Sequence, residues 1–330
     1  MSQLFNTLAL CPGSENGVGP ELLLSSLLHH NFNANFIWCS DKLSLERAAF
    51  RNKSTIEFLS NNKVCLKPGL TLEYLRDYPS ALNTSQRAAL SLKNAVDLAL
   101  SKKINAIVTG PVEKADLSSL LDGPWPGQTE YFSHHLSKPG QKAFMAFLGA
   151  PFIMSMMSVH SPLKKIPQII NKDAVIKRIF ALAHESSIIL GKNAKKINIA
   201  VLGLNPHAGE NGLLGAEEIE HIIPAIKICN EEGYNITGPH AADGFFAYHQ
   251  RYAPDVVLAM YHDQGLIPYK MLAHNAVNAT LGLSVPRTSP AHGTANELVG
   301  SGNASFESTS KAIELAIKLA DSSRQITSNL

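Results

Sequence analysis

Short apolar segments alternate along this chain with longer segments in which apolar residues recur at helical spacing. Short apolar runs predict buried strands, and the helical spacing predicts amphipathic helices. The expected strands are 4–11, 36–39, 104–108, 197–205 and 254–261, and the expected helices are 20–29, 44–50, 84–100, 172–190, 217–229 and 308–320. This alternation is typical of an α/β protein with a largely parallel sheet.

Proline and glycine interrupt two of the apolar segments. The longest uncharged segment, 143–159, contains Gly149 and Pro151. It is shorter than the roughly 20 residues of a membrane-spanning helix, so we expect two buried strands joined by a turn. Pro224 lies inside the helix expected at 217–229, where it predicts a kink or a break.

The composition is that of a packed globular protein with little net charge. Hydrophobic residues make up 45% of the chain, and 29 Lys and Arg against 27 Asp and Glu give a formal charge of +2. This balance gives no reason to expect a nucleic acid or a membrane as a partner. The first residues lack the basic and apolar regions of a signal peptide, and the 4 cysteines are widely spaced. We therefore expect a cytoplasmic protein without a thiolate zinc site.

Histidines stand out among the candidate functional residues. Three of the 13 follow expected strands directly: His160, His207 and His262. Ligands of open α/β sheets bind beyond the carboxyl ends of strands, and three imidazoles that meet there can hold a divalent metal. The alternative for each is an ordinary solvated histidine, because their separations match no local zinc motif. Asp243 and Asp263 are nearby carboxylates that can orient a ligand or simply cap a loop.

A second group of candidates is suited to anions. Lys270 and Arg287 can bind phosphate or carboxylate, and Arg does so with two parallel hydrogen bonds. Asn278 lies between them in the sequence, and Thr129 adds a hydroxyl in a glycine-flanked loop. The alternative for each cation is a solvated surface position.

No common nucleotide-binding or hydrolase fingerprint is present. The chain lacks a G-x-G-x-x-G segment between a strand and a helix, a Walker loop and a G-x-S-x-G elbow. The candidate for dinucleotide binding is 282–302, a long, polar segment whose small residues would let its backbone approach an adenine or a phosphate.

Four segments together carry a family resemblance that extends over essentially the whole chain. They are VTGPVEKA at 108–115, LNPHAGENGLLGAEE at 204–218, LAMYHDQGLIPYK at 258–270 and VNATLGLSVPRTSPAHGTANELVGSGNA at 277–304. The sequence resembles the 4-hydroxythreonine-4-phosphate dehydrogenase family of pyridoxal 5'-phosphate biosynthesis. The resemblance implies an isocitrate/isopropylmalate dehydrogenase-like fold, with two α/β/α domains and an active-site cleft between them. It implies a nucleotide-binding domain from both chain ends, 1–127 and 282–330, and a metal, substrate and dimerisation domain at 128–281.

The resemblance also implies a reaction. In it, 4-phosphohydroxy-L-threonine is oxidised by NAD or NADP and decarboxylated to 3-amino-2-oxopropyl phosphate and CO2, with the help of one divalent metal. Zinc, cobalt and magnesium all remain open as the metal. The family forms homodimers in which each active site takes residues from both subunits.

Individual roles follow from matching motifs. The implied metal ligands are His160, His207 and His262, one of them expected from the partner subunit, and the implied substrate ligands are Gln128, Thr129, Lys270, Asn278 and Arg287. The implied nucleotide ligands are Gly282, Leu283, His292, Gly293, Thr294 and Ala295. Asp243 and Asp263 are the candidates for the proton acceptor.

The chain departs from the family pattern at several positions. Gln128 replaces the usual histidine of a GHTE segment, and glutamine keeps a donor and an acceptor but cannot carry a charge. The first glycine-rich loop carries Ser14, Glu15 and Asn16 where the family reads close to GDPAGIGPE, and Gly244 replaces a common threonine. These departures leave three alternatives open. One is a sister dehydrogenase of 4-phospho-threonate or 4-phospho-erythronate, another is an impaired paralogue that only binds a phosphorylated metabolite, and the third is a metal-dependent hydrolase without nucleotide.

Overall fold

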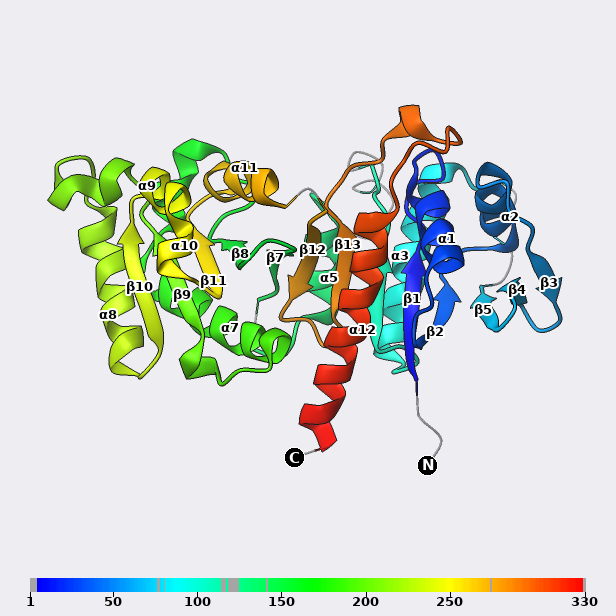
Figure 1. Cartoon of the computed structure of the whole chain (residues 1–330), viewed down its shortest axis with the longest axis horizontal. Coiled ribbons are helices and arrows are strands. Elements are labelled where there is room, and N and C mark those ends of the chain that lie inside the picture. The colour runs from blue at the N-terminus through cyan, green and yellow to red at the C-terminus, as the bar shows by residue number, and fades with distance from the viewer. Residues whose placement is uncertain are drawn as a thin grey trace. The chain divides into compact units, whose positions relative to one another are not determined.

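The chain is divided into two compact units in the computed structural model (Figure 1). The structure describes residues 5–75, 78, 79, 81–113, 117, 125–140, 142–273 and 275–328, with side chains described up to 323. The first unit comprises 1–143 and 277–330, and the second comprises 144–276. The domain boundaries expected from the sequence differ, because they assign 128–143 and 277–281 to the other domain.

The sheet of the first unit is parallel at its centre and antiparallel on both sides. Its strands are β1 (Asn6–Cys11), β2 (Ala34–Trp38), β3 (Glu57–Leu59), β4 (Lys63–Lys67), β5 (Leu70–Tyr74), β6 (Ala106–Thr109), β12 (Val277–Leu281) and β13 (Arg287–Pro290). They lie in the order β12-β13-β6-β1-β2-β5-β4-β3. All neighbours from β13 to β5 are parallel, whereas β12, β4 and β3 run antiparallel to their neighbours.

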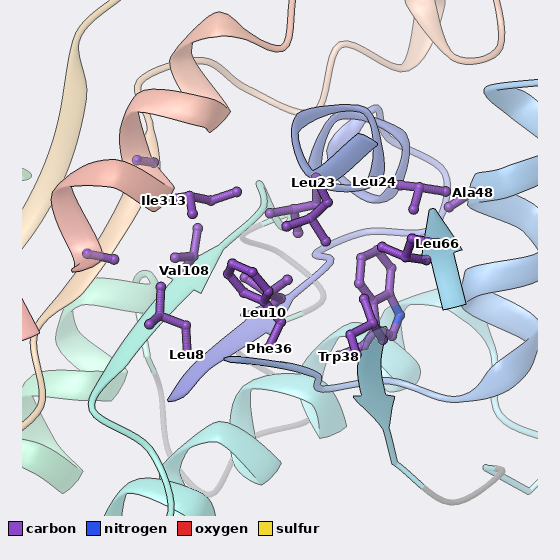
Figure 2. Close-up of a cluster of buried hydrophobic side chains, with 14 of the residues drawn as sticks. Leu8, Leu10, Leu23, Leu24, Phe36, Trp38, Ala48, Leu66, Val108 and Ile313 are labelled. Atoms are coloured by element: carbon purple, nitrogen blue, oxygen red, sulfur yellow. The ribbon is translucent and has the colours of Figure 1, made fainter. Parts of the chain in front are cut away.

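Helices cover both faces of this sheet. They are α1 (Gly19–His29), α2 (Lys42–Arg51), α3 (Thr84–Leu100), α5 (Gln128–Leu136), the short 3-10 helix Asn296–Leu298 and α12 (Glu307–Ser328). Successive residues of a strand point to opposite faces, so Leu8 and Leu10 of β1 pack in one cluster. That cluster includes Leu23 of α1 and Ile313 of α12 (Figure 2).

The opposite face of β1 contributes to a second hydrophobic cluster. Ala9 and Cys11 lie there with residues of α3 and α5, among them Tyr131, Phe132 and Leu136. Because these three side chains of α5 are buried in the core of the first unit, 128–143 belongs to that unit rather than to the second.

The second unit contains a smaller, mainly parallel sheet. Its strands are β7 (Phe144–Leu148), β8 (Ile153–Met156), β9 (Asn198–Leu202), β10 (Asn235–His240) and β11 (Val256–Ala259), in the order β10-β9-β11-β8-β7. Only β7 is antiparallel to its neighbour, β8. The expectation of two strands joined by a turn within 143–159 is confirmed.

Several helices, most of them short, surround this second sheet. They are Leu163–Lys165, α6 (Ile166–Ile169), α7 (Lys172–Leu190), Ala194–Lys196, Pro206–Gly212, the π-helix Glu218–Ile222, α8 (Ile223–Glu231), α9 (Ala242–Ala247), α10 (His249–Tyr252) and α11 (His262–Leu272). Pro224 lies in the first turn of α8, where the π-helix ends. The chain stays helical from 217 to 231, so the predicted break is not present, and the proline lies instead where the hydrogen bonding changes from π to α.

The α/β fold class is confirmed by parallel strands that alternate with helices in both units. The antiparallel β3–β5 segment and the β12–β13 pair were not expected from the sequence, because their strands are short and carry few apolar residues. Within the part of the chain that the structure describes, no helix is long and apolar enough to cross a membrane.

Candidate functional site

Three loops meet at the carboxyl edge of the first unit's sheet. They follow β1, β6 and β13, and β1 lies between β2 and β6, at the point where the strand order reverses. Ser14 N donates to Pro111 O at 2.9 Å, and Val18 N donates to Thr294 O at 2.9 Å. The first glycine-rich loop is therefore in direct contact with the other two.

Glycines make this close approach between the loops sterically possible. A Cβ at Gly110 would lie 2.3 Å from Pro12 O, and one at Gly17 would lie 2.9 Å from Thr294 O. By contrast, a Cβ at Gly293 would have no described atom within 4 Å, so this glycine borders open space. The backbone at Gly293 is thus accessible to a ligand.

The predicted nucleotide residues fall into two groups. His292, Gly293, Thr294 and Ala295 lie in the loop after β13, and His292 Nδ1 lies 2.9 Å from Gly293 O. His292 Nε2 is buried without a hydrogen-bond partner in the described part of the chain. Leu283 instead packs in the hydrophobic cluster that includes residues of α5, and Gly282 O accepts from Lys138 N, so both have contacts within the fold of the first unit.

Arg287 is the most deeply buried of the candidate substrate residues. It begins β13 and is only 3% exposed. Its guanidinium donates to Thr109 Oγ1 from Nε at 3.0 Å and from Nη2 at 2.6 Å, and to Thr280 Oγ1 from Nη1 at 3.3 Å. Among the described residues no carboxylate forms an ion pair with it. Burial lowers the pKa of this guanidinium to about 10.

Gln128 completes the surroundings of this guanidinium. Its Oε1 accepts from Arg287 Nη2 at 3.1 Å, and its Nε2 donates to Gly110 O at 3.1 Å. The amide therefore links the buried cation to the loop after β6. Thr129 follows at the start of α5 and is half-buried.

Asn278 lies in the strand paired with β13. Within β12, Asn278 is two positions from Thr280, so these two side chains lie on the same face of the sheet. Thr280 is paired with Arg287 of β13. Asn278 Oδ1 is buried and has no hydrogen-bond partner among the described residues. The structure thus brings Gln128, Asn278 and Arg287 together in one unit.

Glu15, one of the departures from the family pattern, lies in an ion-pair network. It is 3% exposed and contacts Arg47, and its Oε1 lies 3.5 Å from Arg87 Nε. Arg87 also donates to Asp41 Oδ2 from Nη1 at 2.6 Å and from Nη2 at 2.9 Å. These cations compensate the buried carboxylates, and they fix the first glycine-rich loop against α2 and α3.

Two of the predicted metal ligands are neighbours in the second unit. The ring centroids of His160 and His262 are 6.1 Å apart. Both line an open pocket of about 340 Å³, together with Tyr261 and Asp263. Asp263 Oδ1 lies 2.6 Å from His262 Nδ1, and an ionised carboxylate can only accept, so the proton is on Nδ1. This contact leaves Nε2 of His262 available for a metal.

Lys270 and Asp243 are exposed residues of the same unit. Lys270 lies in the last turn of α11, which begins at His262, and Asp243 lies in the first turn of α9. Neither residue lines the pocket between His160 and His262.

His207 lies in a backbone segment of unusual conformation. Five consecutive residues, 207–211, have φ between 44° and 82°, and four of them are not glycine. The left-handed conformation costs about 1–2 kcal/mol for each non-glycine residue. Contacts from elsewhere must therefore hold this turn in place.

Two side chains not predicted as site residues hold the loops of the histidines. Glu218, 1% exposed, accepts from Leu204 N at 2.7 Å and from Asn205 N at 2.8 Å. Gln264 accepts from Met260 N at 2.7 Å and donates to Gly203 O at 2.6 Å, so it joins the loop after β9 to the loop after β11. Both lie inside segments that carried the family resemblance, but neither is of a residue type that indicates metal binding by itself.

The residues of one chain fit part of a metal site. His160 and His262 are close enough to share an ion, and imidazole nitrogens suit zinc or cobalt. Among the described residues, however, no three His, Cys, Asp or Glu side chains are close enough to hold one ion together. His207 does not line the pocket of the other two. The three predicted ligands therefore do not come together within the described residues of one chain.

Comparison with known proteins gives consistent results. The model of the family described as "Pyridoxal phosphate biosynthetic protein PdxA" matches residues 37–316. The chain is 36% identical to a 4-hydroxythreonine-4-phosphate dehydrogenase from Sulfurihydrogenibium sp. strain YO3AOP1, over 94% of this chain and 98% of that protein.

Solved structures agree with the sequence comparisons. A 4-hydroxythreonine-4-phosphate dehydrogenase from Burkholderia phymatum has a TM-score of 0.74 and 31% identity, over 96% of this chain and 99% of that one. The enzyme of the same name from Klebsiella pneumoniae has a TM-score of 0.77 and 28% identity, over 97% and 99% of the two chains.

Proposed function

This chain belongs to the PdxA family of pyridoxal phosphate biosynthetic proteins, and from that premise we propose that it is a 4-hydroxythreonine-4-phosphate dehydrogenase. The proposed reaction is the oxidative decarboxylation of 4-phosphohydroxy-L-threonine to 3-amino-2-oxopropyl phosphate and CO2, with NAD or NADP as oxidant. The structural observation that carries the proposal is the buried guanidinium of Arg287, which donates only to neutral groups among the described residues.

A buried cation that forms no ion pair with a described carboxylate is suited to bind an anion. Burial lowers the pKa of Arg287 despite the nearby carboxylate of Glu130, so the charge is only partly compensated, and an anionic ligand recovers the remaining cost when it binds. We assign the phosphate of the substrate to Arg287, with Gln128 and Asn278 as neutral partners. The unpaired Oδ1 of Asn278 is suited to accept from a substrate hydroxyl or ammonium group.

The remaining polar residues have proposed roles in binding and orientation. Lys270 is assigned to the substrate carboxylate, and the loop 292–295 to the nucleotide, which takes up the hydride when bound. Asp243 is the proposed proton acceptor, because Asp263 is already hydrogen-bonded to His262. Binding and orientation of the substrate by such groups account for a large part of the expected rate enhancement.

The proposed metal site takes residues from two copies of the chain. His160 and His262 supply one side, and His207 of a second copy supplies the third ligand. A bound divalent metal lowers the pKa of a coordinated hydroxyl and stabilises the negative charge that develops on its oxygen. Exposed apolar residues next to the His207 turn support a homodimer, since Leu213 is 80% exposed and Ile219 is 48% exposed.

Two alternatives predict different substrates or no turnover. A sister dehydrogenase would oxidise 4-phospho-threonate or 4-phospho-erythronate, which carry the same phosphate but lack the ammonium group. An impaired paralogue would bind a phosphorylated metabolite without reducing the nucleotide, and the substitution at Gln128 is the observation that favours either one.

The decisive experiment follows reduction of NAD or NADP by the purified protein with each of the three substrates. We expect reduction with 4-phosphohydroxy-L-threonine, its loss with a chelator, and its recovery with zinc, cobalt or magnesium. His207→Ala should abolish metal-dependent turnover, whereas His184→Ala, at an exposed histidine of α7, should not.

Each other outcome contradicts a definite part of the proposal. Turnover only with the threonate or erythronate would establish the sister activity. Saturable binding without nucleotide reduction would establish the impaired paralogue. Full activity of His207→Ala without metal would refute the ligand assignment.

A further inference from the structure

The direction of the His207 side chain is set by the conformation of the backbone around it. Its imidazole is exposed and has no hydrogen-bond partner in the part of the chain that the structure describes. His262 differs, because Asp263 holds its Nδ1. The direction of the His207 side chain is therefore set by the left-handed turn 206–212, whose conformation L-amino acids rarely adopt without external support.

One buried carboxylate supplies that support. Glu218 Oε1 accepts from the backbone nitrogens of Leu204 and Asn205, at 2.7 and 2.8 Å, and its Oε2 accepts from Asn205 Nδ2 at 2.9 Å. Three donors thus converge on one side chain. A carboxylate satisfies all three because it only accepts, whereas an amide would direct a donor toward at least one of them.

The same carboxylate is also packed against the turn itself. A Cβ at Gly209, where φ is +82°, would lie 2.7 Å from Glu218 Oε2. Gly203 is equally tight, since its Cβ would lie 2.8 Å from Ala208 Cα. The strand exit, the left-handed turn and the Glu218 side chain therefore fit together without free space.

We propose that Glu218 is a positioning residue that holds the turn 206–212 so that His207 is presented in a fixed direction to the metal. This inference rests on the proposed function, because it takes His207 as a metal ligand. When a residue that orients a metal ligand without binding the metal itself is replaced, metal affinity commonly falls by about 10- to 100-fold.

The test compares Glu218→Gln with Glu220→Gln, a substitution at an exposed glutamate of the same π-helix. Hydrogen exchange of the metal-free protein measures the opening of 203–214, and titration with Co²⁺ alone measures metal affinity through its absorption spectrum. For Glu218→Gln we expect faster exchange in 203–214 and a Co²⁺ affinity lowered by about 10- to 100-fold. Glu220→Gln should match the wild type in both measurements.

Gly209→Ala is a second variant, for the case that Glu218→Gln fails to fold. It disturbs the same contact from the other side, while the side chain that accepts from 204 and 205 remains a carboxylate. Its matched control is Gly191→Ala, which also places alanine at a positive φ, +65°, but with no atom within 4 Å. We expect weaker Co²⁺ binding in Gly209→Ala alone.

The outcomes separate this inference from the proposed function. Unchanged exchange in 203–214, or faster exchange with unchanged Co²⁺ affinity, would overturn the role of Glu218. If the wild type binds no Co²⁺, the proposed metal site fails and the inference falls with it. Faster exchange in that case would show that Glu218 holds the turn for another reason.

Discussion

The two units prepare their candidate binding groups in opposite ways. In the first unit, Arg287 is buried and its guanidinium is held by Thr109, Thr280 and Gln128 before any ligand binds. In the second unit, His160, His207 and His262 stand at or near the surface, and only two of them are close together. All the described contacts of Arg287 come from its own unit. The three histidines of the second unit, by contrast, are not gathered around one point.

In the proposed function, this difference follows from what each site binds. A guanidinium always carries its charge, so a fixed and dry cradle gives the strongest and most selective contact with a phosphate. A metal site assembled from separate loops, and in our proposal from two chains, cannot be buried in advance. In that proposal, the histidines are held in position by residues that bind their loops or rings. These residues are Glu218, Gln264 and Asp263.

The largest expected effect comes from removing the buried charge of the first unit. Arg287→Met should lower kcat/KM by about 100-fold or more, since a charged hydrogen bond to the phosphate is lost. Phosphate protection against thermal unfolding should disappear as well. Steady-state kinetics and a thermal shift series with inorganic phosphate measure both effects.

Arg178→Met is the matched control for this prediction. Arg178 lies in α7, is half-buried, has a pKa lowered to about 10 by desolvation, and packs over the Phe144 ring at 4.5 Å. Its replacement should change stability but leave phosphate binding intact. Equal loss of phosphate binding in both variants would refute a specific anion site at Arg287.

A smaller effect is expected when the neutral partner of Arg287 is given a charge. Gln128→Glu places a carboxylate about 3 Å from the guanidinium, where it competes with the phosphate and faces Gly110 O. KM should rise by about 10-fold or more, with a smaller change in kcat. Gln168→Glu, at an exposed position, is the control, and an unchanged KM in Gln128→Glu would place the phosphate elsewhere.

The smallest expected effect concerns the acid stability of the second unit. His240 stacks near Phe245 and Tyr252, and burial lowers its pKa below the ordinary value of 6.5. Below pH 6.5 the unfolded chain therefore binds more protons at this position than the folded one, and stability falls as the pH is lowered. His240→Phe should reduce this loss, by about 1–3 °C in Tm near pH 5.5.

The two tryptophans make this last measurement specific. Trp38 and Trp125 both belong to the first unit, so their fluorescence follows that unit, whereas far-ultraviolet circular dichroism follows both. The effect of His240→Phe should appear in the dichroism signal and not in the fluorescence. An equal shift in both signals would show that the units unfold together.

Much of the fold could be predicted from apolar periodicity. The helices at 84–100 and 172–190 and the strand pair inside 143–159 agree with the structure, because each is long or strongly apolar. The strands β12 and β13 could not be predicted in this way, since they are short and carry Asn278 and Arg287 toward a polar site.

The candidate site was predictable by residue type but not by arrangement. Histidines and cations at strand ends indicate binding, and Arg287 and Gln128 do lie together. Nothing in the sequence shows that Leu283 is a core residue, or that Glu218 reaches back across a left-handed turn. Such contacts depend on tertiary packing between segments, and part of the VTGPVEKA loop, Lys114 and Ala115, lies outside the described residues.

The division of the first unit between the two chain ends has a consequence for biosynthesis. Asn6 Nδ2 donates to Asp321 Oδ1 at 2.6 Å, and Ile313 of α12 packs in the same cluster as Leu8 (Figure 2). The ribosome makes β1 and β2 first, but the core that they share requires α12. The second unit is contiguous, so all its residues have been synthesised before the first unit can close its core. The core beside the anion cradle of Arg287 is thus finished only after α12 has been synthesised.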